Sequence, residues 1–151
     1  MKDLIRIIDG IAKYGLSTNL KIENKEKDLE RNLVELYSYY FNVTHESDDR
    51  KYPDFDKKLF PHVIDNVRYN FPDFGFYHTV LNSNEILSDI ETGTGDAEDD
   101  LTDIIYDILQ IKWRIENNSD MNGLWYFKLI FKGHTQQHLI DLLNFMKSKN
   151  G

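Results

Sequence analysis

Two histidines and a row of aspartates in the last third of the chain are the residues best suited to do chemistry. His134 and His138 are four positions apart, so on a helix both imidazoles lie on one face. Imidazole nitrogens at this spacing bind zinc, manganese or iron when a carboxylate from a second helix joins them. The pair therefore indicates a candidate metal site, whose chemistry would be the activation of a water molecule for hydrolysis.

The carboxylates come from the segment that follows Gly95. On a helical wheel, Asp96, Asp100, Asp103 and Asp107 fall within one narrow sector. Like charges on successive turns of a helix repel each other by roughly 0.2–0.5 kcal/mol per pair, so we expect solvent, a basic neighbour or a cation to compensate for them. The metal hypothesis takes Asp100, Asp103 and Asp107 as the acidic ligands that face the histidine pair.

A second interpretation of the same residues needs no ion. Histidines on a helix commonly form hydrogen bonds to a buried carboxylate or carbonyl group, and a row of aspartates is commonly a solvated face. The Glu-rich motifs of di-metal helical bundles are absent from the sequence. No catalytic nucleophile is predicted either, because the chain has no cysteine and no Gly-x-Ser-x-Gly motif.

Aromatic residues in the same segment offer a different function, which is protein binding. Trp113 and Tyr106 are candidate anchors for a partner, with Asp96 as a third candidate interface residue, because aromatic side chains dominate interface energetics. The alternative for Trp113 is packing against a neighbouring helix.

The charge balance narrows the classes of function. The chain has 26 acidic and 18 basic residues, which gives a formal net charge of -8. Binding to nucleic acid or to an anionic membrane needs a basic surface, so neither partner is predicted. A basic protein partner would suit this charge, and solubility alone also explains it. The absence of cysteine excludes disulfides and thiolate metal sites.

No targeting or membrane segment is predicted. The segment 1–9 is interrupted by charges and lacks the apolar centre of a signal peptide. No apolar run in the chain is long enough to cross a bilayer. Both observations predict a cytoplasmic protein.

The elements that position the candidate residues are helices. Apolar residues recur at helical spacing, and strand signals are weak, so we predict a single all-α domain over residues 1–151, a bundle of about five helices. Pro61 would break the third helix into two short pieces. Antiparallel packing of the last two helices would bring the aspartates to the histidines. The predicted helices span residues 4–14, 27–42, 53–69, 96–117 and 122–147.

Two blocks in this half of the chain form a recognisable pattern. Residues 95–104 read Gly-Asp-x-x-Asp-Asp-Leu-x-Asp-Ile, and an aromatic-rich helix follows with His-x-x-x-His and Leu-x-Asp at 134–141. The pattern resembles a bacterial family catalogued as a domain of unknown function, number five thousand and sixty-three in that series. The resemblance implies a short all-α domain, and it implies no activity because the family has none established.

Two functions are therefore predicted. The first is a non-enzymatic protein-binding module, an adaptor or an immunity-type inhibitor of a basic partner, which needs no cofactor. The alternative is a divalent-metal-dependent hydrolase that uses His134, His138 and one or more of Asp100, Asp103 and Asp107. Histidines that point at the acidic row across an open cleft would favour the hydrolase, and histidines hydrogen-bonded within a closed core would favour a structural role.

Overall fold

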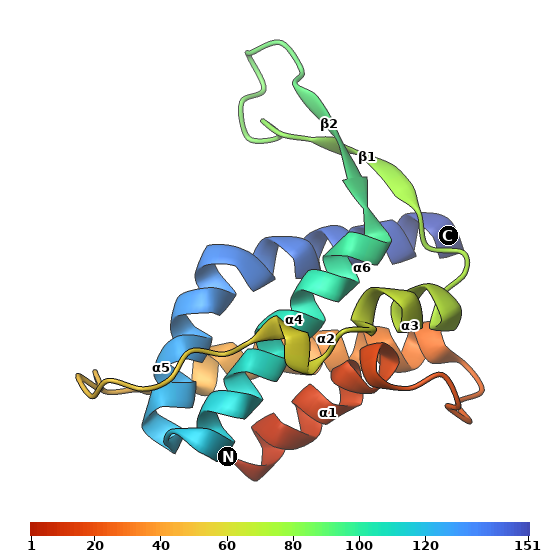
Figure 1. Cartoon of the computed structure of the whole chain (residues 1–151). Coiled ribbons are helices and arrows are strands. Elements are labelled where there is room, and N and C mark those ends of the chain that lie inside the picture. The colour runs from red at the N-terminus through yellow and green to blue at the C-terminus, as the bar shows by residue number, and fades with distance from the viewer.

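The chain folds into helices and one short β-hairpin, as a computed structural model that describes all residues 1–151 shows (Figure 1). A 3₁₀ turn at Lys57–Leu59 precedes α3, and a π-helical segment at Phe131–Thr135 joins α5 to α6 without a break. The α-helices are α1 (Lys2–Leu16), α2 (Lys25–Asn42), α3 (Val63–Asn70), α4 (Ala97–Asn117), α5 (Asp120–Ile130) and α6 (Gln136–Asn150).

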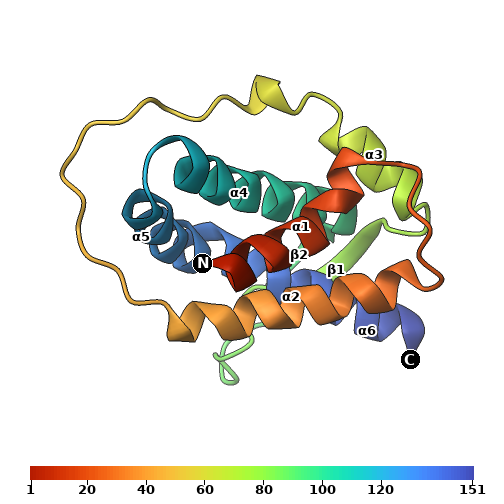
Figure 2. The ribbon, with the colours of Figure 1, turned by 90° about the horizontal axis from the view of Figure 1, so that it is seen from below.

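Helix α4 packs against α1, α3, α5 and α6, and it therefore forms the centre of the fold. Its apolar residues recur every three or four positions, so they form one stripe that faces its neighbours. α1 lies between α4 and α2 when the molecule is seen from below (Figure 2). All these helices contribute to one hydrophobic core, and the fully buried residues of the α4 stripe are Leu101, Ile104, Ile105, Ile108 and Ile111.

Polar side chains fix the starts of the helices that carry the site. The Asp96 carboxylate accepts a hydrogen bond from the backbone N–H of Glu98 and caps α4. The Ser119 hydroxyl does the same for α5 by accepting from Asn122. Such caps satisfy backbone donors that have no partner within the helix. Asp96 thus has a structural role at the helix end.

The prediction of a helical fold is confirmed, but the prediction that it is purely all-α is wrong. β1 (Phe76–Val80) pairs antiparallel with β2 (Thr92–Asp96), in the register that joins Phe76 to Asp96. The segment of β2 has two glycines in five residues, a composition typical of loops, so its sequence gave no strand signal. Gly95 is needed there, because a methyl group at this position would overlap the ring of Tyr77.

The expected break at Pro61 is confirmed. The predicted helix 53–69 is a 3₁₀ turn followed by α3, because proline cannot donate the hydrogen bond that a continuous helix needs. Its predicted start at Pro53 is wrong, since residues 53–56 are not helical. The last helix is longer than the predicted 122–147 and contains the π segment, which periodicity did not reveal. No helix combines the length and the apolar character needed to cross a bilayer.

Candidate metal centre

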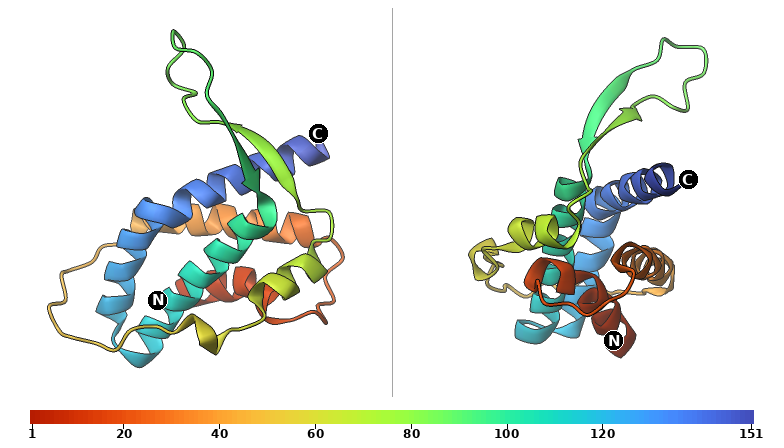
Figure 3. Two further views of the ribbon diagram at one scale, coloured as in Figure 1. Left: turned by 45° about the horizontal axis from the view of Figure 1, so that its top comes forward. Right: turned by 90° about the vertical axis from the view of Figure 1, so that its right-hand side faces the viewer.

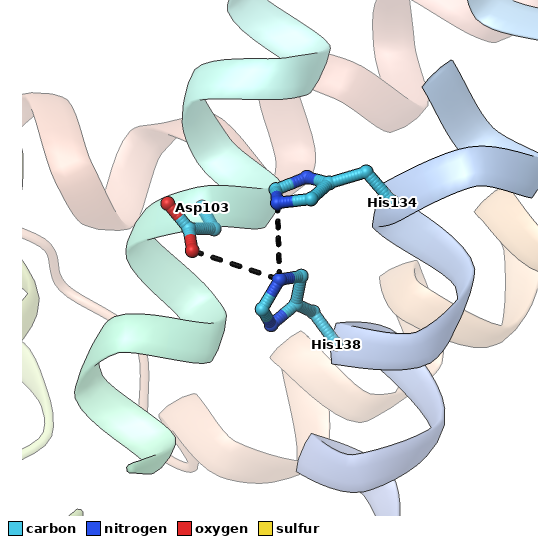
Figure 4. Close-up of side chains that lie close together, drawn as sticks. All are labelled: Asp103, His134 and His138. Carbon is cyan, nitrogen blue, oxygen red and sulfur yellow. Dashed lines mark hydrogen bonds and ion pairs between the residues drawn. The ribbon is translucent and has the colours of Figure 1, made fainter. Parts of the chain in front are cut away.

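The structure brings the aspartate row and the histidine pair together. Helices α4 and α6 pack side by side, and Asp103 of α4 faces His134 and His138 on the opposite segment (Figure 4). Asp100 and Asp107, which lie one turn to either side of Asp103, each contact one of the two histidines. Of the four predicted aspartates, only Asp96 lies outside the site.

A π-helical turn carries the first histidine. In this turn the backbone N–H of Gln136 donates to the carbonyl of Phe131, five residues back. Phe131 and Thr135 point into the core, whereas His134 between them stays partly open to solvent. The turn thus inserts one residue into the helical ladder and sets the direction in which His134 points, and turns of this kind are frequent at functional sites.

Each imidazole is oriented by its own carboxylate. His134 Nδ1 lies 2.8 Å from Asp107 Oδ2, and His138 Nδ1 lies 2.7 Å from Asp100 Oδ1. An ionised carboxylate can only accept, so in both rings Nδ1 carries the proton and donates it. The other ring nitrogen, Nε2, is then left with a free lone pair in the neutral histidine. This carboxylate–histidine pairing is typical of metal sites, where it fixes the tautomer and the ring orientation of a ligand.

The two orienting carboxylates are themselves buried and held in place. The Thr135 hydroxyl donates to Asp107 Oδ2 over 2.7 Å, and the Tyr77 hydroxyl donates to Asp100 Oδ2. Asp100 and Asp107 are both buried, and burial makes a carboxylate depend on such partners. Tyr77 belongs to β1, so the hairpin contributes directly to the support of His138.

The free ring nitrogens converge on one point with a third carboxylate. The two Nε2 atoms are 3.2 Å apart, and His138 Nε2 lies 3.6 Å from Asp103 Oδ2. One ligand atom from each of these three residues lies within 4.8 Å of the others. Two nitrogens bound to a tetrahedral zinc ion at ~2.0–2.1 Å are about 3.3 Å apart. The spacing therefore suits such an ion, and two lone pairs this close need a cation or a proton between them.

Electrostatics favour positive charge at this point. The hydrogen bond to Asp100 raises the pKa of His138, which outweighs the opposite effect of burial. Burial raises the pKa of Asp107, and hydrogen bonds from His134 and Thr135 only partly offset this. Burial and the Asp100 carboxylate raise the pKa of Tyr77 as well, so its hydroxyl keeps its proton and remains a donor. A proton and a metal ion would thus compete for the same nitrogen of His138.

The candidate ligand side chains are accessible to solvent, whereas the carboxylates of Asp100 and Asp107 that orient the histidines are buried. The side chains of His134, Asp103 and His138 are 43%, 37% and 26% exposed. The site therefore shares one feature with each of the two arrangements weighed from the sequence, although it is neither an open cleft nor a closed core. Its histidines are hydrogen-bonded at Nδ1 to buried carboxylates, and they face solvent and the acidic row at Nε2.

The aromatic residues predicted as an interface are engaged within the fold. The Tyr106 hydroxyl donates to the carbonyl of Phe60 over 2.8 Å. Trp113 packs edge-on against Phe55, with ring centroids 6.0 Å apart. These contacts leave Asp96, Tyr106 and Trp113 scattered along α4 in separate structural roles.

Two residues of the site are missing from the sequence-based set. Thr135 adjoins His134, but its hydroxyl serves Asp107 on the other helix, a partner that helical spacing alone does not reveal. Tyr77 reaches Asp100 only because the hairpin folds back onto the start of α4. The one sequence signal for Tyr77 is the glycine opposite it, Gly95, which makes room for its ring.

Comparisons of the chain with protein-family models, curated proteins and solved structures gave no match. The resemblance to the family of unknown function therefore stays a prediction. The function has to be inferred from the geometry of the site.

Proposed function

We propose that the protein binds a divalent transition-metal ion through Asp103, His134 and His138, and that the ion activates water for hydrolysis. The observation that supports this most is the convergence of both Nε2 atoms and the Asp103 carboxylate within 4.8 Å. Both histidines are already oriented for ligation by Asp100 and Asp107, as ligands in metal sites are.

The donor set limits the metal and its chemistry. Two imidazole nitrogens and one carboxylate oxygen suit zinc, manganese or iron, and they disfavour magnesium and calcium, which prefer oxygen. Three protein ligands leave a coordination position for water, as in catalytic rather than structural zinc sites. Zinc held by Asp103, His134 and His138 would lower the pKa of a bound water from 15.7 toward about 7, and would thus supply hydroxide near neutral pH.

The surroundings of the site indicate the charge of the substrate. Ten acidic residues and no lysine or arginine lie between Arg68 and Lys112, a stretch that includes β1, β2 and most of α4. Burial and the neighbouring carboxylates of Asp96 and Asp103 raise the pKa of Asp99, which reflects this concentration of negative charge. Such a field attracts cations and repels polyanions, so we expect a neutral or cationic substrate.

Metal analysis of protein purified without a histidine tag tests the binding step. We expect one zinc, manganese or iron ion per chain and a rise in melting temperature when the ion is added to metal-free protein. The replacements His134→Ala, His138→Ala and Asp103→Ala remove both effects, whereas His45→Ala, at an exposed loop position, retains them. Protein without stoichiometric metal, and without a thermal shift on adding zinc, manganese or nickel, would refute the metal site.

A separate assay tests hydrolysis. Metal-loaded protein is incubated with chromogenic esters, amides and phosphoesters, before and after treatment with a chelator. We expect turnover of a neutral or cationic substrate. The chelator should abolish this turnover and added metal should restore it. The variant His138→Ala should lack the activity, whereas His45→Ala should keep it. Tight metal binding without turnover of any class would leave the site as a structural or storage site.

The non-enzymatic protein-binding function, which the sequence analysis placed first, becomes our second proposal. Its support is the acidic stretch between Arg68 and Lys112, which would suit a basic partner of the adaptor or immunity type. Charge reversal at Glu85 and Asp89, two exposed members of that stretch, tests it against a candidate basic protein. Binding that is insensitive to this reversal and to salt would exclude an electrostatic partner at this surface.

A further inference from the structure

The tip of the β-hairpin exposes a group of large apolar side chains. Leu87 is 100% exposed and Ile86 is 90% exposed, and Leu81, Ile90 and Val80 are exposed as well. We call these five residues the hairpin tip. Val80, Ile86 and Ile90 line one hollow at this tip, and exposed apolar groups of this kind usually mark an interaction surface.

The hairpin lacks support from the helices beyond its base. At the base, Tyr77 packs against Phe145 with ring centroids 5.7 Å apart and donates its hydrogen bond to Asp100. Further out, each strand pairs only with the other strand, and the hairpin projects away from the helices (Figures 1 and 3). An isolated two-stranded ladder is marginally stable in water, so cover from outside would stabilise it.

An apolar groove on the same chain has the matching character. It lies between α2 and α6 and has a volume of about 470 Å³. Six of its seven lining residues are hydrophobic, and Phe41 and Ile140 at its surface are exposed. We call it the α2–α6 groove. Its lining residues are Val34, Tyr37, Ser38, Phe41, Leu139, Ile140 and Leu143.

We propose that the hairpin tip of one copy of the chain docks in the α2–α6 groove of a second copy, and that the exchange is mutual. The tip and the groove are both apolar and exposed, and burying each against the other removes both surfaces from water. The hairpin leans toward the side of the molecule on which α6 and α2 lie (Figure 3). A two-fold axis can therefore place each hairpin across the other copy, as in symmetric homodimers.

Two lysines without a partner in the chain lie near the groove and complement the acidic hairpin tip. The hairpin carries Glu85, Asp89 and Glu91 near its tip and has no lysine or arginine. Lys27 and Lys147 line a separate hollow farther along α2 and α6, together with Glu26 and Glu30. Neither lysine has an ion-pair partner within the chain, whereas the nearby Lys149 is paired with Glu26. The acidic tip would be repelled by anionic lipids, which disfavours a membrane as the alternative occupant.

Sedimentation equilibrium over a wide range of protein concentration tests the dimer. We expect the full chain to form a concentration-dependent dimer. The double replacement Ile86→Ser with Leu87→Ser weakens it by about ten-fold or more, because it removes the docked apolar groups. Both side chains are almost fully exposed, so folding should not change. Leu59→Ser, at an exposed apolar position outside both surfaces, is the matched control and leaves the dimer intact.

A mixing experiment shows whether the tip meets the groove or another tip. The groove variant carries Phe41→Ser and Ile140→Ser, and by itself it should dimerise as poorly as the tip variant. Mixed copies regain one intact contact, since the tip of the groove variant fits the groove of the tip variant. Energy transfer between differently labelled copies should therefore reappear in the mixture, with weaker association than for the original chain.

Three results would overturn the proposal. The original chain could remain monomeric at all concentrations. A dimer could survive the tip variant or the groove variant. The mixture of the two variants could fail to associate while circular dichroism shows that both are folded.

Discussion

His134 and His138 lie one turn apart but are held by different parts of the fold. Asp107 and Thr135 fix His134 from α4 and from the π segment, whereas Asp100 and Tyr77 fix His138 from α4 and from the hairpin. Both support groups act through a buried carboxylate, and neither carboxylate is a proposed ligand. The site therefore has an inner set of three residues, which we propose as ligands, within an outer set that fixes their direction.

Replacing an orienting carboxylate should weaken metal binding although the residue does not touch the ion. We expect Asp100→Asn and Asp107→Asn each to reduce zinc affinity by about 10–100-fold, because the imidazole loses its charged acceptor and its fixed tautomer. Competition with a chromophoric chelator measures the affinity. Asp99→Asn, a neighbouring exposed carboxylate, is the control for loss of charge alone, and a similar loss in that variant would mean that orientation does not matter.

The Thr135 hydroxyl should matter for stability. It is 1% exposed and donates to a buried carboxylate, so Thr135→Val leaves Asp107 with one donor fewer. We expect a loss of about 1–3 kcal/mol in the free energy of unfolding, the usual cost of an unsatisfied buried polar group. Thr135→Ser keeps the hydroxyl and should lose much less. Urea titration of both variants makes the comparison, and equal losses would point to the methyl group instead.

Helical spacing predicted that the histidines and aspartates meet, but it took Asp100 and Asp107 as ligands, whereas the structure pairs both with the histidines at Nδ1. His134, His138 and Asp103 follow from helical spacing, because residues three or four apart share a face and two such faces on packed helices meet. Tyr77 and Thr135 do not follow, because each acts on a residue of another element. Their partners depend on how a hairpin with weak strand signals and a π turn are placed, and neither leaves a clear periodicity.

Among the elements, the π segment decides how the last helix presents the site. Its extra residue lets Phe131 and Thr135 both enter the core while His134 faces α4. Gly133 lies in this turn on the exposed side, with nothing near the position of a side chain. The long helices and the break at Pro61 were predictable from apolar spacing and from proline chemistry, whereas the π segment and the hairpin were not.

Alanine should replace Gly133 with a gain in stability. Glycine in a helical backbone costs roughly 0.5–1 kcal/mol relative to alanine, and the space around Gly133 is open. We expect Gly133→Ala to raise the free energy of unfolding by about that amount and to leave zinc affinity unchanged. A loss of zinc affinity in a more stable protein would show that alanine converts the π turn into a regular α-turn and rotates His134.

The contact between α1 and α2 makes stability depend on pH. Burial raises the pKa of Asp28, but hydrogen bonds from Lys13 and Tyr14 lower it more, so the folded-state pKa lies below the ordinary value of about 3.9. The stabilisation is therefore present above that value and is lost as pH falls through the folded-state pKa.

Asp28→Asn should therefore destabilise the protein by about 1–3 kcal/mol at neutral pH, the range for a hydrogen bond to a charged group. The difference from the original chain should shrink once the pH falls below the ordinary aspartate value. Denaturant titrations at a series of pH values measure it, with the exposed Asp54→Asn as control. A difference that persists at low pH would mean that packing, not the charge, is lost.

The whole molecule is electrically uneven. The stretch between Arg68 and Lys112 has ten acidic residues and no basic ones, so it carries a formal charge of -10. The rest of the chain has 18 basic and 16 acidic residues and is therefore slightly positive. This asymmetry places the hairpin and Asp103 of the candidate metal centre in the negative part of the chain. The overall composition indicated an acidic protein, but only the position of the charges along the chain shows where cations are attracted.

Salt should weaken metal binding through this field. Screening reaches about 10 Å at 0.1 M ionic strength, so carboxylates beyond the ligands contribute less as potassium chloride is added. We expect zinc affinity to fall several-fold between low and high salt, and to fall less in Asp96→Asn with Asp99→Asn. Affinity that is independent of salt would confine the electrostatic contribution to the ligands and their direct partners.

Tyr77 belongs to the hairpin and to the support of His138 at the same time, and this has a thermodynamic consequence. If the proposed dimer forms, docking of the hairpin would hold the Tyr77 hydroxyl on Asp100, and an ion on His138 would favour the same arrangement. Linkage requires the two effects to be reciprocal, so the factor by which dimerisation tightens ion binding is also the factor by which the ion tightens dimerisation. The Tyr77 hydroxyl would then make the ion content of one copy depend on whether the second copy is bound.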